Sequence, residues 1–221
     1  MESVINWLLD FLITLPVILL SLSVHEFMHG FAAYRLGDST AKYMGRLSLN
    51  PLRHIDPLGF VALIFFHVGW AKPVSVNARA FKNPKRDMAI TALAGPVSNF
   101  VLAFLFSFVS VFLYRLGLTL GWFAGNEISP FYVLWLMTRY MVIINLGLGI
   151  FNLIPIPPLD GSKILYAFLP YRVIVKIVPY EKYLQFAMLL LLWIGALSVP
   201  IQRGVTFFLN LFTDLAMGVF F

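Results

Sequence analysis

Long apolar segments separated by polar connections dominate this chain, and they predict helices that cross a membrane. Five segments show the pattern, at about residues 5–36, 88–116, 131–154, 183–199 and 205–221. A helix needs ~20 residues to cross ~30 Å of hydrocarbon, so the first three segments are ample and the last two are near the lower limit. The fifth contains Asn210 and Asp214 and could instead lie in the membrane interface. The pattern predicts an all-α polytopic membrane protein folded as a helical bundle.

Two shorter patterns follow the first segment. The stretch Leu58–Trp70 is apolar but too short to span, which indicates a re-entrant element. Between Val74 and Ala80, apolar residues such as Val76 alternate with polar ones such as Asn77. A period of two predicts a short strand. Because an unpaired strand near a membrane leaves backbone groups unsatisfied, we expect a β-hairpin with the preceding residues.

The composition supports a membrane protein and narrows its chemistry. The chain of 221 residues is 60% hydrophobic, with a mean hydropathy of +0.86, whereas about half of a globular protein is apolar. Its length leaves little room for an appended soluble domain, so we expect one integral-membrane domain over residues 1–221. The chain has no cysteine, which excludes disulfides and thiolate sites, so a metal would be bound by histidine and carboxylate.

Basic residues distinguish the two sides of the membrane. The connections after the first and third segments are rich in Lys and Arg, whereas the connection after the second has none beyond Arg115. The positive-inside rule then places both basic connections in the cytoplasm. The net charge of +6 is therefore typical of a protein of the plasma membrane, and we do not expect nucleic acid as a partner.

One motif supplies most of the candidate chemistry. His25, Glu26 and His29 form H-E-x-x-H inside the first apolar segment. On a helix, the two histidines lie one turn apart on one face and can bind one zinc ion, while the glutamate can act on a zinc-bound water. The alternative is a chance polar cluster in a helical bundle. Ionisable residues are costly in lipid and usually mark function, which favours the metal site.

A third metal ligand is expected outside this motif, because catalytic zinc usually has three protein ligands and an open position for water. The basic loop downstream offers Asp38, His54 and Asp56. Asp160 is the better candidate, since it follows the proline-broken stretch 152–158, and irregular backbone at membrane depth is tolerated only around a cavity or inside protein. The alternative role for Asp160 is a helix N-cap, which is compatible with metal binding.

Further motifs accompany the histidine pair. They are Ala94-Gly95-Pro96-x-x-Asn99 in the second segment, Asn152-x-x-Pro155 and Leu159-Asp160-Gly161 after the third, and Gly45-Arg46-Leu47-x-Leu49-Asn50-Pro51 in the basic loop. Together with His25-Glu26-x-x-His29, these motifs resemble the site-2 protease family, in particular its compact prokaryotic members. The resemblance implies a zinc endopeptidase that cuts peptide bonds in or near transmembrane helices. It also implies zinc on His25, His29 and Asp160, with Glu26 as the general base.

Other polar residues have less certain roles. Asn152 and Asn99 could contact the substrate or an oxyanion, or they could satisfy broken backbone and join helices. The predicted strand, with Val74, Val76 and Asn77, could accept an unwound substrate by strand addition. Such pairing would matter because a helix opened in lipid leaves its backbone groups unsatisfied.

We therefore expect a zinc-dependent intramembrane protease whose partners are membrane-protein substrates and the lipid bilayer. His29 lies six residues before Arg35, about 9 Å from the cytoplasmic end of the first helix, so the active site should lie within the membrane toward the cytoplasm. One alternative is a membrane metal-binding or transport protein, which would need ligands distributed across the bilayer. A second is a proteolytically silent homologue that binds membrane proteins, against which the intact Glu26 argues.

Overall fold

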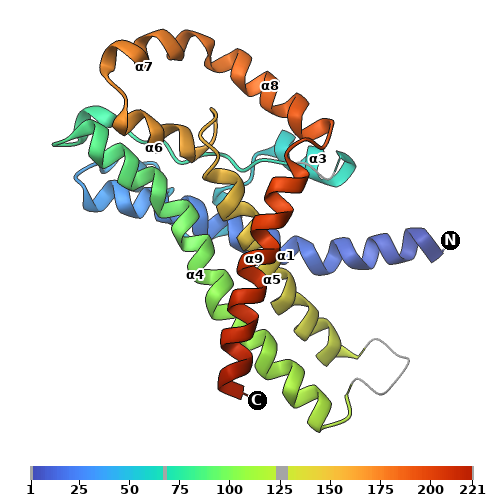
Figure 1. Cartoon of the computed structure of the whole chain (residues 1–221). Coiled ribbons are helices and arrows are strands. Elements are labelled where there is room, and N and C mark those ends of the chain that lie inside the picture. Colours follow the sequence, from blue (N-terminus) through green and yellow to red (C-terminus); the bar gives the residue numbers. More distant parts are fainter. Residues whose placement is uncertain (1, 67–68, 123–128, 221) are drawn as a thin grey trace.

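The computed structural model describes residues 2–66, 69–122 and 129–220, and it is built from helices (Figure 1). The elements are α1 (Glu2–Arg35), α2 (Thr40–Tyr43), η1 (Pro51–Arg53), α3 (Pro57–Phe66), η2 (Ala78–Ala80), α4 (Pro84–Thr119), α5 (Pro130–Asn152), α6 (Asp160–Phe168), α7 (Tyr171–Ile177), η3 (Val178–Tyr180), α8 (Glu181–Trp193) and α9 (Ser198–Phe220).

Helices α1, α4 and α5 are long and apolar enough to cross a membrane. Local sequence explains where two of them begin. Pro84 opens α4, where a missing N–H is tolerated, and the carboxylate of Asp87 accepts a hydrogen bond from the Asn83 N–H at 3.0 Å. The Ser129 side chain accepts a hydrogen bond from the Tyr132 N–H at the start of α5. The prediction of a helical, multi-pass membrane protein is confirmed.

The C-terminal region divides differently from the prediction. The break between helices lies at residues 194–197, inside the segment 183–199 that was expected to span, and Gly195 takes a positive φ of 74° there. The pair formed by residues 171–193 and 198–220 is bent by 74° and is apolar enough only when both parts are taken together. These two segments therefore make at most one span. Figure 1 shows α9 beside α4 and α5, while α7 and α8 arch away from the bundle.

The predicted β-hairpin is wrong. Among the described residues there is no strand, only one antiparallel bridge between Ile55 and Ala71. Helix α3 takes up most of the stretch expected to be re-entrant, of which residues 67 and 68 lie outside the described part. Residues 72–77 have no regular secondary structure, and Asn77 has extended dihedral angles (φ −101°, ψ 100°). Burial alternates from Val74, which is half-buried, to Asn77, which is exposed. The alternation of apolar and polar residues in the sequence thus predicted alternating burial, but it does not determine whether a partner strand is present.

The region where α1, α4 and α5 meet has a polar interior. Ser21 on α1, Asn99 on α4 and Asn145 on α5 are each 0% exposed. Helices in lipid gain little from apolar burial against one another, so small and polar side chains often form their contacts. An apolar cluster of Ala103, Val142 and Leu146 packs beside this region. The candidate site described below adjoins this polar interior.

Candidate metal centre

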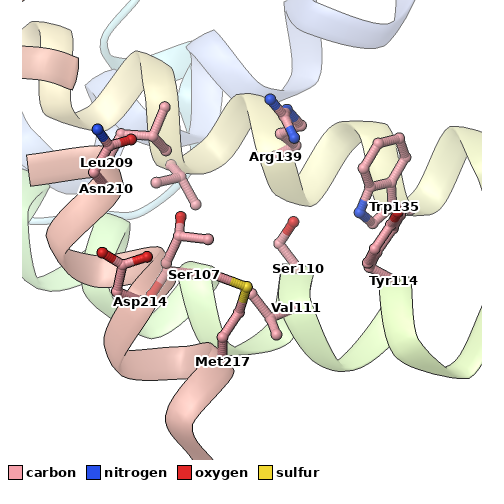
Figure 2. A pocket seen from close by; sticks show the side chains of 12 residues that line it. Ser107, Ser110, Val111, Tyr114, Trp135, Arg139, Leu209, Asn210, Asp214 and Met217 are labelled. Carbon is pink, nitrogen blue, oxygen red and sulfur yellow. The ribbon is translucent and has the colours of Figure 1, made fainter. Parts of the chain in front are cut away.

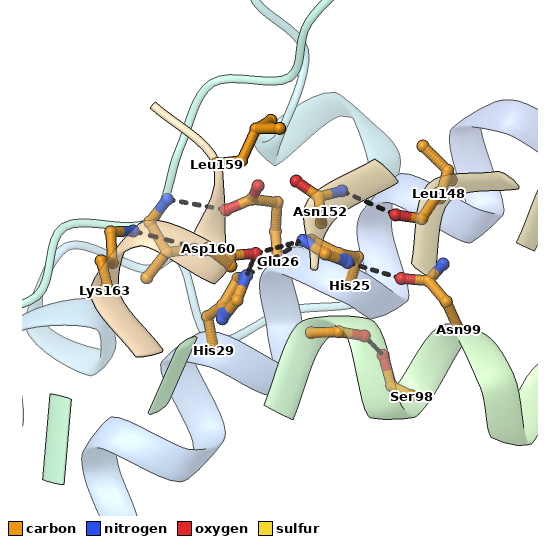
Figure 3. Close-up of polar contacts among 12 residues, drawn as sticks. His25, Glu26, His29, Ser98, Asn99, Leu148, Asn152, Leu159, Asp160 and Lys163 are labelled. Atoms are coloured by element: carbon orange, nitrogen blue, oxygen red, sulfur yellow. Dashed lines mark hydrogen bonds and ion pairs between the residues drawn. The ribbon is translucent and has the colours of Figure 1, made fainter. Parts of the chain in front are cut away.

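Helix α1 places the two histidines of the motif on one face, as their spacing requires. The Nε2 atoms of His25 and His29 are 3.0 Å apart, and the two residues are 4% and 8% exposed (Figure 3). The two rings lie nearly perpendicular to each other. Both imidazoles therefore present the same nitrogen to one point inside the protein.

Asp160 reaches the same point from the start of α6. Helix α5 ends at Asn152, prolines prevent its continuation, and Asp160 is the first residue of α6. Its Oδ2 lies 3.2 Å from His25 Nε2 and 3.0 Å from His29 Nε2. Its side chain makes no N-cap hydrogen bond, since Leu159 is the N-cap residue. A Cβ at Gly161 would lie 2.5 Å from the Ile154 carbonyl oxygen, so glycine is needed where the loop folds against α6.

Hydrogen bonds on the outer edges of the imidazoles decide their tautomers. The Nδ1 of His25 is 2.5 Å from the Asn99 side-chain oxygen, and the Nδ1 of His29 is 2.8 Å from the Thr91 carbonyl oxygen. Both partners are acceptors, so each Nδ1 carries the hydrogen and each Nε2 has a free lone pair. This tautomer is assigned from the hydrogen-bond partners.

The three inner atoms fit a bound cation. Two imidazole lone pairs and a carboxylate oxygen face one another at 3.0 to 3.2 Å, with no hydrogen between them to share. Such acceptors repel one another unless a positive charge lies among them. Ligand atoms at 2.0–2.1 Å from a tetrahedral zinc ion are roughly 3.3 Å apart. Two histidines and one carboxylate are also a donor set that zinc accepts at catalytic sites.

Glu26 lies beside the ligands without joining them. Its Oε2 accepts a hydrogen bond from the Val74 N–H at 2.8 Å. Segment 72–77 therefore lies next to the motif on α1 and orients this carboxylate. Of the three residues proposed to present a substrate, Val74 thus donates to Glu26, and the Asn77 N–H donates to Asp38 at 2.7 Å. Val76 is half-buried between them. Two N–H groups of the segment are thus bound by side chains, and among the described residues no strand pairs with it.

Asp38 anchors this segment rather than binding the metal. It is 1% exposed and also accepts hydrogen bonds from the Thr40 N–H and hydroxyl. Burial works to raise the pKa of Asp38, but the hydrogen bonds from Thr40 and Asn77 outweigh it and lower that pKa. Of the other alternative ligands, His54 is buried in the loop and Asp56 accepts from the Gly59 N–H at 2.9 Å.

The two asparagines with tentative roles have different surroundings. Asn99 is fully buried, and both ends of its amide are occupied, by His25 and by Asn145. It holds a ligand in place, and its role toward a substrate stays a prediction. Asn152 is half-buried and donates to the Leu148 carbonyl at 3.0 Å. Figure 3 shows its side chain close to Glu26 and His25, and its role toward a substrate stays a prediction.

Sequence reasoning missed a chain of hydrogen bonds behind His25. Asn99 donates to Asn145 at 2.7 Å, and Asn145 donates both to Ser21 Oγ and to the Met141 carbonyl, each at 2.8 Å. Because the Met141 carbonyl can only accept, it fixes which way the Asn145 amide points, and Asn145 in turn fixes Asn99. The only sequence signal for these residues was their polarity within apolar segments.

Gly95 on α4 makes room for the imidazoles. A Cβ at this position would overlap His29 Nε2 and lie 2.7 Å from His25 Cε1. The close packing of α4 on α1 over the histidines therefore depends on a residue without a side chain. Pro96 follows inside the same helix, where it removes one backbone hydrogen bond.

Comparison with known proteins agrees with this geometry. The family model described as Peptidase family M50 matches residues 13–132 and 128–195. "Putative zinc metalloprotease YwhC" of Bacillus subtilis is 38% identical over 166 residues, which cover 75% of this chain and 73% of that protein. "Putative zinc metalloprotease MJ0611" of Methanocaldococcus jannaschii is 31% identical over 162 residues, which are 72% of this chain and 71% of that protein. No solved structure matches the chain.

A longer relative is covered only in part. "Putative zinc metalloprotease Rip2" of Mycolicibacterium smegmatis is 34% identical over 155 residues, which are 68% of this chain and 55% of that protein.

The fold and site define a membrane metallopeptidase, and the matches say which kind. The chain belongs to Peptidase family M50, the site-2 protease family, so the resemblance seen in its motifs is confirmed. Zinc as the cofactor is confirmed as well, and the structure offers His25, His29 and Asp160 to hold it.

Proposed function

We propose that this protein is an intramembrane endopeptidase that hydrolyses peptide bonds in or near the transmembrane helices of other membrane proteins. The observation that carries the proposal is the buried cluster of His25, His29 and Asp160, with Glu26 beside it, on helices of membrane-spanning length. A soluble substrate would not require such a site to lie within apolar helices.

In this proposal Glu26 moves the protons. Val74 holds its Oε2, which leaves Oε1 to take a proton from the attacking water and to pass it to the departing amine. The water oxygen adds to the carbonyl carbon, the C–N bond breaks, and the amine leaves with that proton. Zinc held by His25, His29 and Asp160 supplies a water of lowered pKa and a Lewis acid for the carbonyl.

The surrounding residues keep the ligands oriented. Asn99 and the Thr91 carbonyl hold the hydrogen on each Nδ1, so each Nε2 stays available as a ligand. A substrate helix must unwind before its carbonyls are accessible, and segment 72–77 next to Glu26 could pair with the unwound part through the backbone groups other than the Val74 and Asn77 N–H, which Glu26 and Asp38 bind. Membrane-protein substrates and lipid are thus the proposed partners.

We also propose the plasma membrane, with the site toward the cytoplasm. The basic connections that contain α2, η1 and α7 support this orientation through the positive-inside rule. Water would then reach Glu26 from the cytoplasmic side. Single cysteines introduced beside His29 into this natively cysteine-free chain should react with a thiol reagent added from the cytoplasm. Reaction only from outside would contradict the orientation.

The function is tested with purified protein in lipid nanodiscs and a panel of single-span membrane proteins. The wild type is expected to cut a subset of them, as mapped by mass spectrometry, and Glu26→Gln should cut none while keeping its zinc. Glu181→Gln, the same change in a half-buried glutamate of α8, is the matched control and should cut like the wild type. Cleavage by Glu26→Gln at the wild-type rate, or no cleavage of any substrate by the wild type, would contradict the proposal.

A further inference from the structure

A mainly apolar cavity of about 290 Å³ lies between α1, α3 and α5. Leu22 and Ser23 line it from α1, Phe60 from α3 and Ile144 from α5, and residues 69–71 close one side. A cavity of roughly 150 Å³ suffices for a benzene ring, so this one has room for the largest aromatic side chains. Among the described residues, the metal ligands are not part of its lining.

The cavity adjoins the catalytic machinery. Leu22 and Ser23 precede Glu26 by four and three residues on α1, so they lie on the face of the helix that carries the general base, one turn deeper. On the opposite side, Trp70 and Ala71 line the cavity, and Val74 three residues later binds Glu26. An extended chain running along segment 72–77 would therefore pass the mouth of this cavity.

The polar groups of its wall are engaged within their own loops and helices. His54 is 2% exposed and donates from Nε2 to the Ser48 carbonyl at 2.7 Å, and its Nδ1 is itself buried. The Asp56 side chain accepts from the Gly59 N–H at 2.9 Å, and the Ser23 hydroxyl donates to the Leu19 carbonyl at 2.6 Å. The surface that the cavity offers to a ligand is therefore mainly apolar.

We propose that this cavity is a specificity pocket for a bulky aromatic residue of the substrate next to the cleaved bond, with phenylalanine preferred. The apolar walls fit a ring, and a phenylalanine side chain fills the cavity without bringing in a polar group that needs a partner. An acidic side chain would be left without a partner among apolar walls and is excluded. This inference rests on the proposed function, since it assigns the residue that the peptidase recognises.

The test uses twelve-residue quenched peptides of apolar sequence in which one position is Ala, Leu, Phe, Trp or Asp. Each position is scanned against the wild-type protein in nanodiscs, and the cut is located by mass spectrometry. At one position beside the cut, kcat/KM should rise from Ala through Leu to Phe by about tenfold or more, with Trp no better than Phe and Asp the poorest. Binding of the same peptides to Glu26→Gln should follow the same order, which tests the pocket without turnover.

Two isoleucines of α5 give a matched pair of variants. Ile144→Phe fills the cavity and should reduce the preference for Phe over Ala to about threefold or less, both in cleavage and in binding. Ile143→Phe, the same change one residue away and outside the lining, should keep the wild-type preference.

The outcomes separate this inference from the proposed function. An active wild type with no preference among the five residues would overturn the pocket and leave the peptidase standing. Equal effects of Ile144→Phe and Ile143→Phe would do the same. A lipid that co-purifies with the wild type and is lost only from Ile144→Phe, together with a flat peptide profile, would assign the cavity to an acyl chain. If no peptide is cut, cleavage of the membrane-protein panel still decides the proposed function, and the binding order on Glu26→Gln decides the pocket.

Discussion

The protein contains two polar clusters among its apolar helices, and they are built in opposite ways. In the metal centre, His25, Asn99 and Asp160 are buried, and each has a named protein partner. The second cluster lines a larger cavity of about 670 Å³ between α4, α5 and α9 (Figure 2). There Arg139 and Asp214 are exposed, and within the described part of the chain no ion pair joins them. The Arg139 guanidinium lies over the Trp135 ring instead.

This comparison shows that defined hydrogen-bond and ion-pair partners identify a functional site better than the size of a cavity or its charge does. A catalytic metal needs ligands held within a fraction of an ångström, which requires packed groups whose donors and acceptors are all assigned. Polar groups around an open cavity can satisfy themselves with water or snorkel toward an interface, so their positions need not be defined. Substitutions in the first cluster should therefore be severe, and comparable ones in the second should be mild.

The largest effects are expected at the ligands and the general base. His25→Ala should lose both the bound zinc, about one per chain in the wild type, and cleavage. Glu26→Gln should keep the zinc and lower kcat by ~10²–10⁴-fold, because it removes a proton acceptor and not a ligand. Zinc is measured by elemental analysis of purified protein, and cleavage with a membrane-protein substrate. Full zinc retention in His25→Ala combined with Asp160→Ala would refute the ligand assignment.

Gly95→Ala should damage the metal centre without changing any ligand. The added methyl group would overlap His29 Nε2 and press on His25, so α4 must shift away from α1 and weaken zinc binding. Gly147→Ala on α5 is the control, because a Cβ there meets no atom within 4 Å. Zinc affinity, measured by competition with a chelator, should fall in the first variant and stay unchanged in the second. Equal affinities would show that the close approach of α4 is dispensable.

Asn145→Leu should have an intermediate effect, since it acts through Asn99. Loss of the acceptor for Asn99 frees the amide to turn, so the hydrogen on His25 Nδ1 is held less well and zinc affinity should fall by about 10–100-fold. In an Asn99→Ala background the same change should cost much less, because the two residues act in one chain. Asn210→Leu in the outer cavity is the matched control. A similar loss of zinc affinity in Asn145→Leu and Asn210→Leu would show that the two clusters do not differ in this way.

The smallest effect is expected at Asp214. Asp214→Asn removes the negative charge of the outer cavity but no hydrogen bond or ion pair within the described residues. Zinc affinity and kcat/KM should stay within about twofold of the wild type, because surface substitutions without defined partners usually have little effect. A loss comparable to that of Asn145→Leu would assign this cavity a part in the reaction.

The sequence alone determined the features that depend on local periodicity. Apolar stretches of sufficient length specified α1, α4 and α5, because a helix satisfies its own backbone in lipid. The spacing of His25 and His29 placed both imidazoles on one face, since residues four apart on a helix are neighbours. The prolines after Asn152 indicated that Asp160 would lie where the helix is broken, and the structure has it at the start of α6.

Tertiary structure decided everything that depends on which elements meet. The alternation from Val74 to Ala80 suggested a strand, but Glu26 and Asp38 take the backbone donors that a strand would have used. The polarity of Asn99 left a substrate contact and a link between helices both open, and the crossing of α1, α4 and α5 places its side chain between His25 and Asn145. A sequence pattern shows which side chains are polar or buried. The partner of each hydrogen bond is set only when helices distant in the chain pack together.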